Sequence, residues 1–221
     1  MDASPGHVQH YERVLSSDER TKAGRFRFAR DEQHFILARG ILRTLTGHYL
    51  ALSPEQVSFH YNQYGRPEIV SPSTTLHFNI SHSHELALLA FTHHRELGVD
   101  VEFMDERVNY DEVAHATFSP HEAATVSSLS GDAKRQAFFN CWTRKEAYIK
   151  ARGIGISLDL TRFDVSLIPG EPTALVQNRE DSREVSRWRF AALDPAPDYA
   201  AALAVEGQHW HARLLQWSFF V

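Results

Sequence analysis

The chain has 221 residues, of which 43% are hydrophobic and 23% charged, and its formal net charge is −5. This ordinary globular composition excludes a disordered, collagen-like or coiled-coil chain. A single cysteine, Cys141, excludes a disulfide framework and any multi-cysteine metal site. No apolar stretch approaches the roughly 20 residues of a membrane span, and the polar first ten residues show no secretory signal. We therefore expect a cytoplasmic protein that binds neither membrane nor nucleic acid.

Apolar periodicity and turn residues predict the elements in chain order. The first long helical pattern covers residues 18–50, and a turn follows at residues 64–67. Alternating or continuous apolar runs predict strands at 57–61, 76–80, 86–92, 97–103, 163–167 and 201–205. Ser119 followed by a proline predicts the start of a helix. The strongest helical pattern covers residues 134–151, and Gly153 is expected to end it.

A faint internal repeat divides the chain. The tripeptide Ala-Arg-Gly ends a helical pattern at residues 38–40 and again at residues 151–153, and strand patterns follow each copy. A helix-then-strands unit used twice predicts an α+β protein of two similar halves. We place the halves at residues 1–105 and 106–221.

Two acidic residues share one face of a predicted strand. In the segment Gly98-Val99-Asp100-Val101-Glu102-Phe103, alternation puts Asp100 and Glu102 on the same side. Neighbouring carboxylates repel each other, and in a cleft a divalent cation such as Mg²⁺ relieves that repulsion. A solvated strand face is the competing interpretation.

The strongest predicted helix carries a third acid and two lysines. Lys145 falls within the apolar stripe, where an ammonium needs an anion for its head group. Glu146 and Lys150 are neighbours one turn apart on the adjoining face. They are either an ordinary surface ion pair or part of a site for a cation and phosphate groups.

Together these segments resemble a known family. Gly98-Val99-Asp100-Val101-Glu102 and Trp142-Thr143-Arg144-Lys145-Glu146-Ala147-Tyr148-Ile149-Lys150 are similar to the paired signature of the 4′-phosphopantetheinyl transferases, in their Sfp type. The turn at 64–67, the motif at 77–83, the stretch at 118–122 and the opening helices at 15–43 resemble further family motifs in the same order. The resemblance covers nearly the whole chain.

The resemblance implies a fold and a reaction. The fold would be the α+β 4′-phosphopantetheinyl transferase-like fold, a monomer of two similar α/β halves related by pseudo-twofold symmetry, with the active site at their interface. The enzyme would transfer 4′-phosphopantetheine from coenzyme A to a serine of an apo acyl- or peptidyl-carrier protein, with Mg²⁺, releasing 3′,5′-ADP. It would activate carriers of fatty-acid, polyketide or nonribosomal-peptide biosynthesis, and the motifs do not select one of these.

The resemblance also implies the role of each reactive residue. Asp100, Glu102 and Glu146 would hold Mg²⁺ against the pyrophosphate of coenzyme A. Lys150 would stabilise or protonate the departing phosphate, and Lys145 would contact a phosphate. The serine proton would go to Glu146 or to a metal-bound water, and sequence leaves that choice open.

Coenzyme A would be bound by residues from several motifs: Lys22, Arg39, Arg66, Pro67, Ser81, His82, Asp100, Lys145 and Lys150. Lys22 would grip the 3′-phosphate. Glu19 and His34 stand where the family has a lysine and an arginine, so Arg30 or Arg39 would supply the missing charge. Glu122 could contact metal, contact substrate or only cap a helix.

Two other functions compete with this one. A non-catalytic module that binds carrier protein or coenzyme A could share the fold, although the complete set of Asp100, Glu102, Glu146 and Lys150 favours an enzyme. A Mg²⁺-dependent phosphodiesterase could use the same carboxylates. The negative net charge disfavours a nucleic-acid substrate for it.

Overall fold

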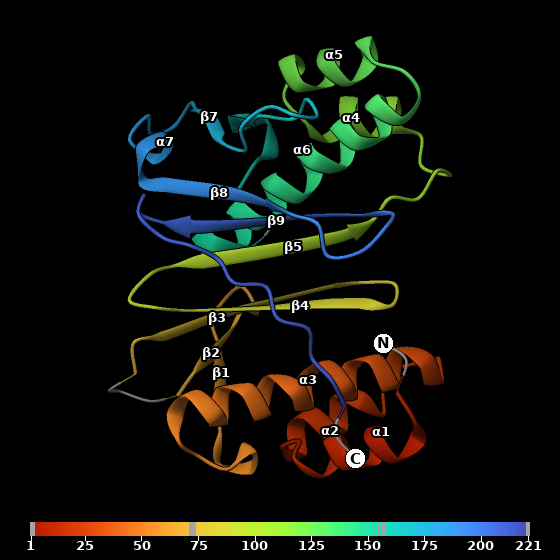
Figure 1. Cartoon of the computed structure of the whole chain (residues 1–221), viewed down its shortest axis with the longest axis vertical. Coiled ribbons are helices and arrows are strands. Elements are labelled where there is room, and N and C mark those ends of the chain that lie inside the picture. Colours follow the sequence, from red (N-terminus) through yellow and green to blue (C-terminus); the bar gives the residue numbers. More distant parts are fainter. Residues whose placement is uncertain (1–2, 71–73, 154, 156–157, 220–221) are drawn as a thin grey trace. The chain divides into compact units, whose positions relative to one another are not determined.

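The computed structural model describes residues 3–70, 74–153, 155 and 158–219, which form two compact units (Figure 1). The first unit comprises Met1–Asn62, Pro67–Leu76 and His211–Val221, and the second comprises Gln63–Arg66 and His77–Trp210. Runs of helices are followed by runs of strands that pair antiparallel, so the predicted α+β class is confirmed. The division into halves at residue 105 stays a prediction.

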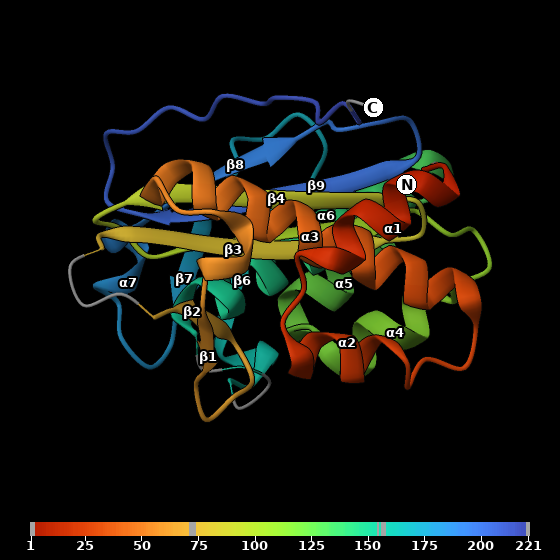
Figure 2. The same ribbon diagram turned by 90° about the horizontal axis from the view of Figure 1, so that it is seen from below.

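Helices dominate the first unit. Its elements are α1 (Pro5–Arg13), α2 (Ser17–Ala23), α3 (Ala29–Leu50), η1 (Pro54–Gln56), β1 (Phe59–Tyr61) and β2 (Pro67–Ile69). Figure 2 shows α1 lying along α3, and β1 and β2 pair as a short antiparallel hairpin. The helix predicted over residues 18–50 is in fact two helices, because the chain leaves helical geometry after Ala23 and re-enters it only at Ala29.

The second unit contains three small sheets and the helices that cover them. Its strands are β3 (Leu76–Ser83, whose first residue belongs to the first unit), β4 (Leu86–His93), β5 (Leu97–Phe103), β6 (Phe163–Val165), β7 (Leu175–Asn178), β8 (Trp188–Leu193) and β9 (Tyr199–Glu206). Its helices are α4 (Tyr110–Thr117), α5 (Pro120–Ser128), α6 (Gly131–Arg152), η3 (Leu160–Arg162) and α7 (Glu184–Arg187). β3 pairs with β4 and β6 with β7, while the third sheet has the order β5-β9-β8.

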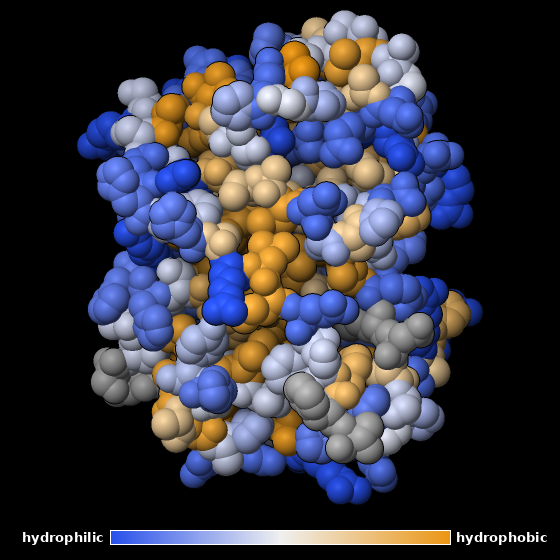
Figure 3. All heavy atoms as spheres, viewed as in Figure 1, coloured by the Kyte–Doolittle hydropathy of each residue, from blue (hydrophilic) through white to orange (hydrophobic). Residues whose placement is uncertain are grey.

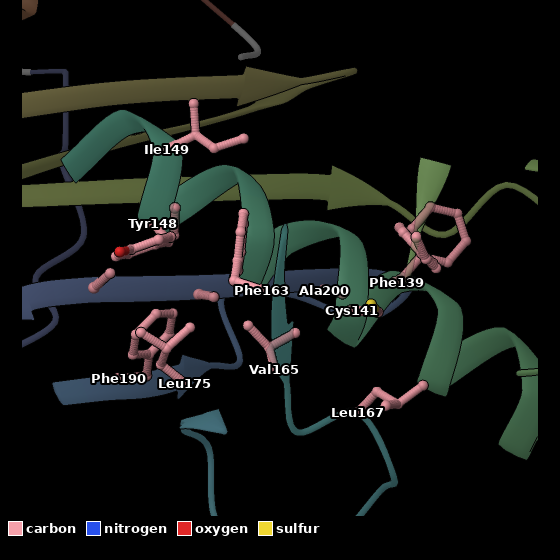
Figure 4. Close-up of a cluster of buried hydrophobic side chains, with 14 of the residues drawn as sticks. Phe139, Cys141, Tyr148, Ile149, Phe163, Val165, Leu167, Leu175, Phe190 and Ala200 are labelled. Carbon is pink, nitrogen blue, oxygen red and sulfur yellow. The ribbon is translucent and has the colours of Figure 1, made fainter. Parts of the chain in front are cut away.

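Helix α6 packs across the sheet of β5, β9 and β8 and buries the main core of this unit (Figure 1). Figure 4 shows Tyr148 of α6 beside Phe163 and Phe190, whose ring centroids lie 4.9 Å and 6.2 Å from its own. Cys141 is fully buried in the same cluster, as a small apolar residue would be. The predicted end of this helix is confirmed, since Gly153 caps α6 with a φ of 65°.

Large apolar side chains are exposed at several places on the described surface. On the face shown in Figure 3, charged and polar side chains surround smaller patches of apolar ones. Exposed apolar residues such as Phe28, Val176 and Leu215 are scattered along the sequence. Among the described helices, none is long and apolar enough to cross a membrane.

Gly98 lies where β5 and α6 come closest. A Cβ atom at this position would overlap the carbonyl oxygen of Ala147 and the backbone nitrogen of Ala151. Both obstacles are backbone atoms of a helix, which cannot move aside as a flexible side chain can. Only glycine therefore allows α6 to lie this close to the strand that carries Asp100.

Replacing Gly98 should separate the two elements. We expect Gly98→Ala to lower the free energy of unfolding by about 2 kcal/mol or more, since the added methyl must push the helix away. Urea unfolding monitored by circular dichroism measures this. Gly6→Ala is the matched control, because its Cβ would meet only the Ser4 hydroxyl at 3.7 Å and should cost nothing. Equal stability of the two variants would contradict the close approach.

Candidate active site

A buried carboxylate on β5 anchors the candidate site. Even-numbered residues of β5 face α6, and Asp100 among them is 2% exposed. Its Oδ1 accepts from Lys150 Nζ at 2.7 Å and from the Ser81 hydroxyl at 2.8 Å, and Lys150 also donates to Ser81 at 2.9 Å. The strand, the helix and β3 thus meet at one carboxylate oxygen.

The second oxygen of Asp100 has a different environment. Asp100 Oδ2 is buried and has no hydrogen-bond partner among the described residues. Burial raises the pKa of Asp100 despite the opposing charge of Lys150. A buried carboxylate oxygen without a donor is costly, and a bound cation would remove that cost.

Glu102 and Glu146 belong to the same electrostatic cluster. Burial, the charge of Asp100 and, more weakly, that of Glu146 raise the pKa of Glu102, while the Ser83 hydroxyl opposes the rise from 2.8 Å. Burial and the charge of Asp100 likewise raise the pKa of Glu146. Three carboxylates therefore share one ammonium, that of Lys150, and each makes ionisation of another more costly. We name Asp100, Glu102 and Glu146 the acidic cluster.

The donor set of the acidic cluster fits Mg²⁺. Its ligands would be hard carboxylate oxygens, and the unpartnered Asp100 Oδ2 is directed at no protein donor. The part of the chain that the structure describes holds no preformed group of three metal-ligating side chains. An ion bound to these carboxylates would share the space beside Asp100 with the Lys150 ammonium, which binds Asp100 in this structure.

Arg66 caps the carboxyl end of α6. Its guanidinium donates to the carbonyl oxygens of Lys150 at 3.1 Å and Ala151 at 3.3 Å, and it pairs with Glu96 at 3.3 Å. A cation at this end of a helix satisfies unpaired carbonyls and interacts favourably with the helix dipole. The structure thus gives Arg66 a role in placing the last turn of α6, which carries Lys150.

Lys145 does not lie in the acidic cluster. Its side chain is fully buried, pairs with Glu122 at 2.7 Å and donates to the carbonyl oxygens of Leu160 and Phe163. These three acceptors use all three N–H groups of an ammonium. This placement leaves no N–H group of Lys145 for a phosphate, so it does not agree with the phosphate contact expected from the resemblance. The difference arises because residues 145 and 146 are separated by about 100° around the helix and face different neighbours.

Glu122 has a structural role in this arrangement. It caps α5 by accepting from the Ser119 backbone N–H at 3.0 Å, and it accepts from Val165 N–H at 2.8 Å. Together with Lys145 it ties α5, α6 and β6 to one another. The capping interpretation of Glu122 agrees with these contacts.

In the first unit, Glu19 pairs with two arginines. Arg39 Nε lies 2.7 Å and Arg43 Nε 2.5 Å from its carboxylate oxygens. Burial alone would raise the pKa of Glu19, but hydrogen bonds from Arg43 and the Ser16 backbone, with the charges of Arg39 and Arg43, outweigh burial and lower it. Arg39 also donates to the Tyr61 hydroxyl and lies over the Phe59 ring. The positive charge of Arg39 is therefore largely balanced by Glu19 within the protein.

Lys22 lines a hollow of about 550 Å³ in the same unit. The remaining lining residues are Asp18, Glu19, Arg25, Phe26 and Tyr61. Lys22 is exposed, with its ammonium 5.3 Å from the centre of the Phe35 ring. Pro67 begins β2 of this unit, whereas His82 is exposed on β3 of the second unit. Of the predicted binding residues, Ser81 and Lys150 are those the structure brings to the acidic cluster.

Sequence reasoning missed Asn79 and Ser83. The side chains of both bond to β5, Asn79 at the Val99 N–H and Ser83 at Glu102. Their two-residue spacing around Ser81 was the signal that could have found them.

Comparison with known proteins identifies the class. Residues 96–204 match the model of the 4′-phosphopantetheinyl transferase superfamily, and residues 2–94 match that of the 4′-phosphopantetheinyl transferase N-terminal region. The chain is 35% identical over 215 residues to the 4′-phosphopantetheinyl transferase HetI of Nostoc sp., covering 96% of this chain and 87% of HetI. It is 29% identical over 153 residues to Sfp of Bacillus subtilis, covering 69% and 66% of the two chains.

The chain belongs to the 4′-phosphopantetheinyl transferase superfamily, in its Sfp type, and is an enzyme of that class. Among solved structures, the holo-[acyl-carrier-protein] synthase of Thermotoga maritima overlaps 52% of this chain and 64% of its own. That overlap has 19% sequence identity and a TM-score of 0.38. The family assignment depends on the sequence matches and not on this overlap.

Removing one partner of the buried Glu122–Lys145 pair should be costly. We expect Lys145→Met to lower the free energy of unfolding by about 3–5 kcal/mol, because it leaves a buried carboxylate without its ammonium. The double variant Glu122→Gln with Lys145→Met should recover part of this loss. Lys134→Met on the same helix breaks only a surface pair with Asp111 and should cost at most about 1 kcal/mol. A Lys145→Met variant as stable as Lys134→Met would argue against the buried pair.

Neutralising Glu146 should stabilise the metal-free protein. Its raised pKa means that the folded state favours the protonated carboxyl, so at pH 7 the ionised form opposes folding. We expect Glu146→Gln to raise the urea midpoint at pH 7 in the presence of EDTA. This gain should fade as the pH falls through the raised pKa of Glu146 toward the ordinary value of 4.5, because the carboxyl then becomes protonated in the folded state as well. Glu180→Gln, at an exposed position, is the control and should leave the midpoint unchanged.

Proposed function

We propose that this enzyme transfers 4′-phosphopantetheine from coenzyme A to a serine hydroxyl of an apo acyl- or peptidyl-carrier protein, with Mg²⁺, and releases 3′,5′-ADP. The observation that carries the proposal is the acidic cluster beside Lys150, with the buried and unpartnered Asp100 Oδ2. The two family models, which together match most of the chain, support the same reaction.

Asp100, Glu102 and Glu146 are the residues that would hold Mg²⁺. When bound, the ion supplies Lewis-acid polarisation of the pyrophosphate and neutralises part of its negative charge. The protein contributes a surplus of carboxylates over ammonium groups at this point, which attracts a divalent cation.

Lys150 supplies the positive charge of the protein at the reacting phosphates. Its ammonium is held by Asp100 and Ser81, and the Lys150 side chain as a whole is 28% exposed, so it is partly accessible to a substrate. As the bond to the departing 3′,5′-ADP breaks, negative charge grows on the leaving phosphate. An ammonium already in place stabilises that charge and can donate its proton to it.

Glu146 is the residue of the cluster suited to accept the serine proton. Its side chain is half-buried and belongs to the acidic cluster beside Lys150. Deprotonation of the carrier serine by Glu146 produces the oxygen that attacks the phosphorus of the pantetheine arm. Proton acceptance by Glu146 and proton donation by Lys150 balance the reaction.

Binding of the rest of coenzyme A is part of the proposal. Lys22 lines the charged hollow of the first unit and is our candidate for the 3′-phosphate, since Arg39 already neutralises Glu19. Arg66, Pro67 and His82 remain candidates for the nucleotide through their motifs. We also propose that the enzyme works as a cytoplasmic monomer.

The reaction is tested by incubating the protein with coenzyme A, Mg²⁺ and a panel of apo acyl- and peptidyl-carrier proteins, and weighing the carriers intact. We expect a mass gain of one phosphopantetheine that EDTA prevents. Asp100→Asn should slow the transfer at least about 100-fold, because it removes a charged ligand from the reacting centre. Asp105→Asn, just beyond β5, is the control and should leave the rate within about twofold.

No transfer to any carrier, with coenzyme A still bound in equilibrium dialysis, would contradict the proposal and favour a non-catalytic binding module. Hydrolysis of coenzyme A without an acceptor would instead favour a phosphodiesterase.

A further inference from the structure

Strand β5 has an edge that no other strand covers in the described sheet. One edge of β5 pairs with β9, and the sheet order β5-β9-β8 leaves the other edge without a strand. Successive N–H groups of a strand point to opposite edges, and exposed edge N–H groups need other acceptors. The N–H groups of residues 99, 101 and 103 face this open edge.

Side chains of β3 accept these three N–H groups in order. Val99 N–H donates to Asn79 Oδ1 at 2.9 Å. Val101 N–H donates to the Ser81 hydroxyl at 3.4 Å, and Phe103 N–H donates to the Ser83 hydroxyl at 3.1 Å. The spacing of two residues on β3 matches the spacing of two on β5. We call Asn79, Ser81 and Ser83 the side-chain ladder.

Two members of the side-chain ladder also hold the carboxylates. The Ser81 hydroxyl donates its proton to Asp100 and the Ser83 hydroxyl donates its proton to Glu102, each at 2.8 Å. A hydroxyl has one donor and two acceptor positions, so each serine can join a backbone N–H of β5 to the carboxylate of the preceding residue. Asn79 accepts from the β5 backbone, and among the described residues no hydrogen bond joins it to a carboxylate.

We propose that Ser81 and Ser83 are positioning residues, which fix the Asp100 and Glu102 carboxylates relative to the β5 backbone, and that Asn79 sets the register of the ladder. A slip of one residue would present Ile80 and His82 to β5, and neither offers a hydroxyl. The inference rests on the proposed function, because it assigns these serines to the carboxylates of the reacting centre.

Ser83 allows the clearest test, since Ser81 also contacts Lys150. The Ser83 hydroxyl donates to a charged carboxylate, so Ser83→Ala should lower kcat about tenfold or more, with KM for coenzyme A within about twofold. Ser83→Thr keeps the hydroxyl and should restore kcat. Thr92→Val removes a hydroxyl from neighbouring β4 and should leave both constants unchanged. Unchanged kcat in Ser83→Ala, or no rescue by Ser83→Thr, would overturn the proposal.

Asn79→Ala separates positioning from general loosening. It removes the acceptor of Val99 N–H while leaving both carboxylates with their serines. If Asn79→Ala and Ser83→Ala lower kcat in the same proportion to their loss of stability, the serines are only structural and the proposal is wrong. We expect Ser83→Ala to lower kcat more than its loss of stability explains.

Amide hydrogen exchange in the protein without metal or coenzyme A provides a readout independent of activity. We expect Ser83→Ala to speed exchange at Phe103 about tenfold and leave Val99 unchanged, with the reverse pattern in Asn79→Ala. If the two variants show this pattern of exchange but the wild-type protein transfers nothing to any carrier, the proposed function fails while the ladder remains. Absence of the pattern in an active enzyme overturns the ladder alone.

Discussion

The close contact of α6 with β5 at Gly98 is the constraint on which the candidate site depends. Without a side chain at this position, the backbone of α6 lies directly against the strand. That separation lets the Lys150 ammonium reach Asp100 at 2.7 Å from the last turn of the helix. Arg66 then holds the end of the same turn through its carbonyl groups. A small backbone feature thus sets the distance between two side chains of the candidate site.

The charged groups of the protein divide into matched and unmatched sets. Glu19 has two arginines, and Glu122 has one lysine and two backbone N–H donors, so burial of these acids is compensated. The acidic cluster, by contrast, has three carboxylates with raised pKa values and one ammonium. Such an excess of buried negative charge destabilises the folded protein locally, and it is typical of a site that a bound ligand completes. The imbalance distinguishes the candidate site more clearly than any one residue does.

One helical motif serves two purposes. Within α6, Lys145 faces Glu122 and the start of β6, whereas Glu146 and Lys150 face β5. A rotation of about 100° per residue is enough to place adjacent motif positions in different environments. Membership in a family motif therefore does not distinguish a residue placed to meet a substrate from one that holds the helix in place.

Where the signal is local, the sequence alone determined which segments form helices and strands and which side chains share a face. Alternation along residues 97–103 placed Asp100 and Glu102 together, helical spacing placed Glu146 and Lys150 on one side of α6, and Gly153 ended the helix as expected. Tertiary structure alone decided the partners of Lys145, Arg66 and Ser83. Their contacts join residues far apart in the chain, such as Arg66 and Lys150, and which acceptor a buried donor meets depends on how the elements pack. Periodicity carries the direction of a side chain, whereas its electrostatic environment arises only when the elements come together.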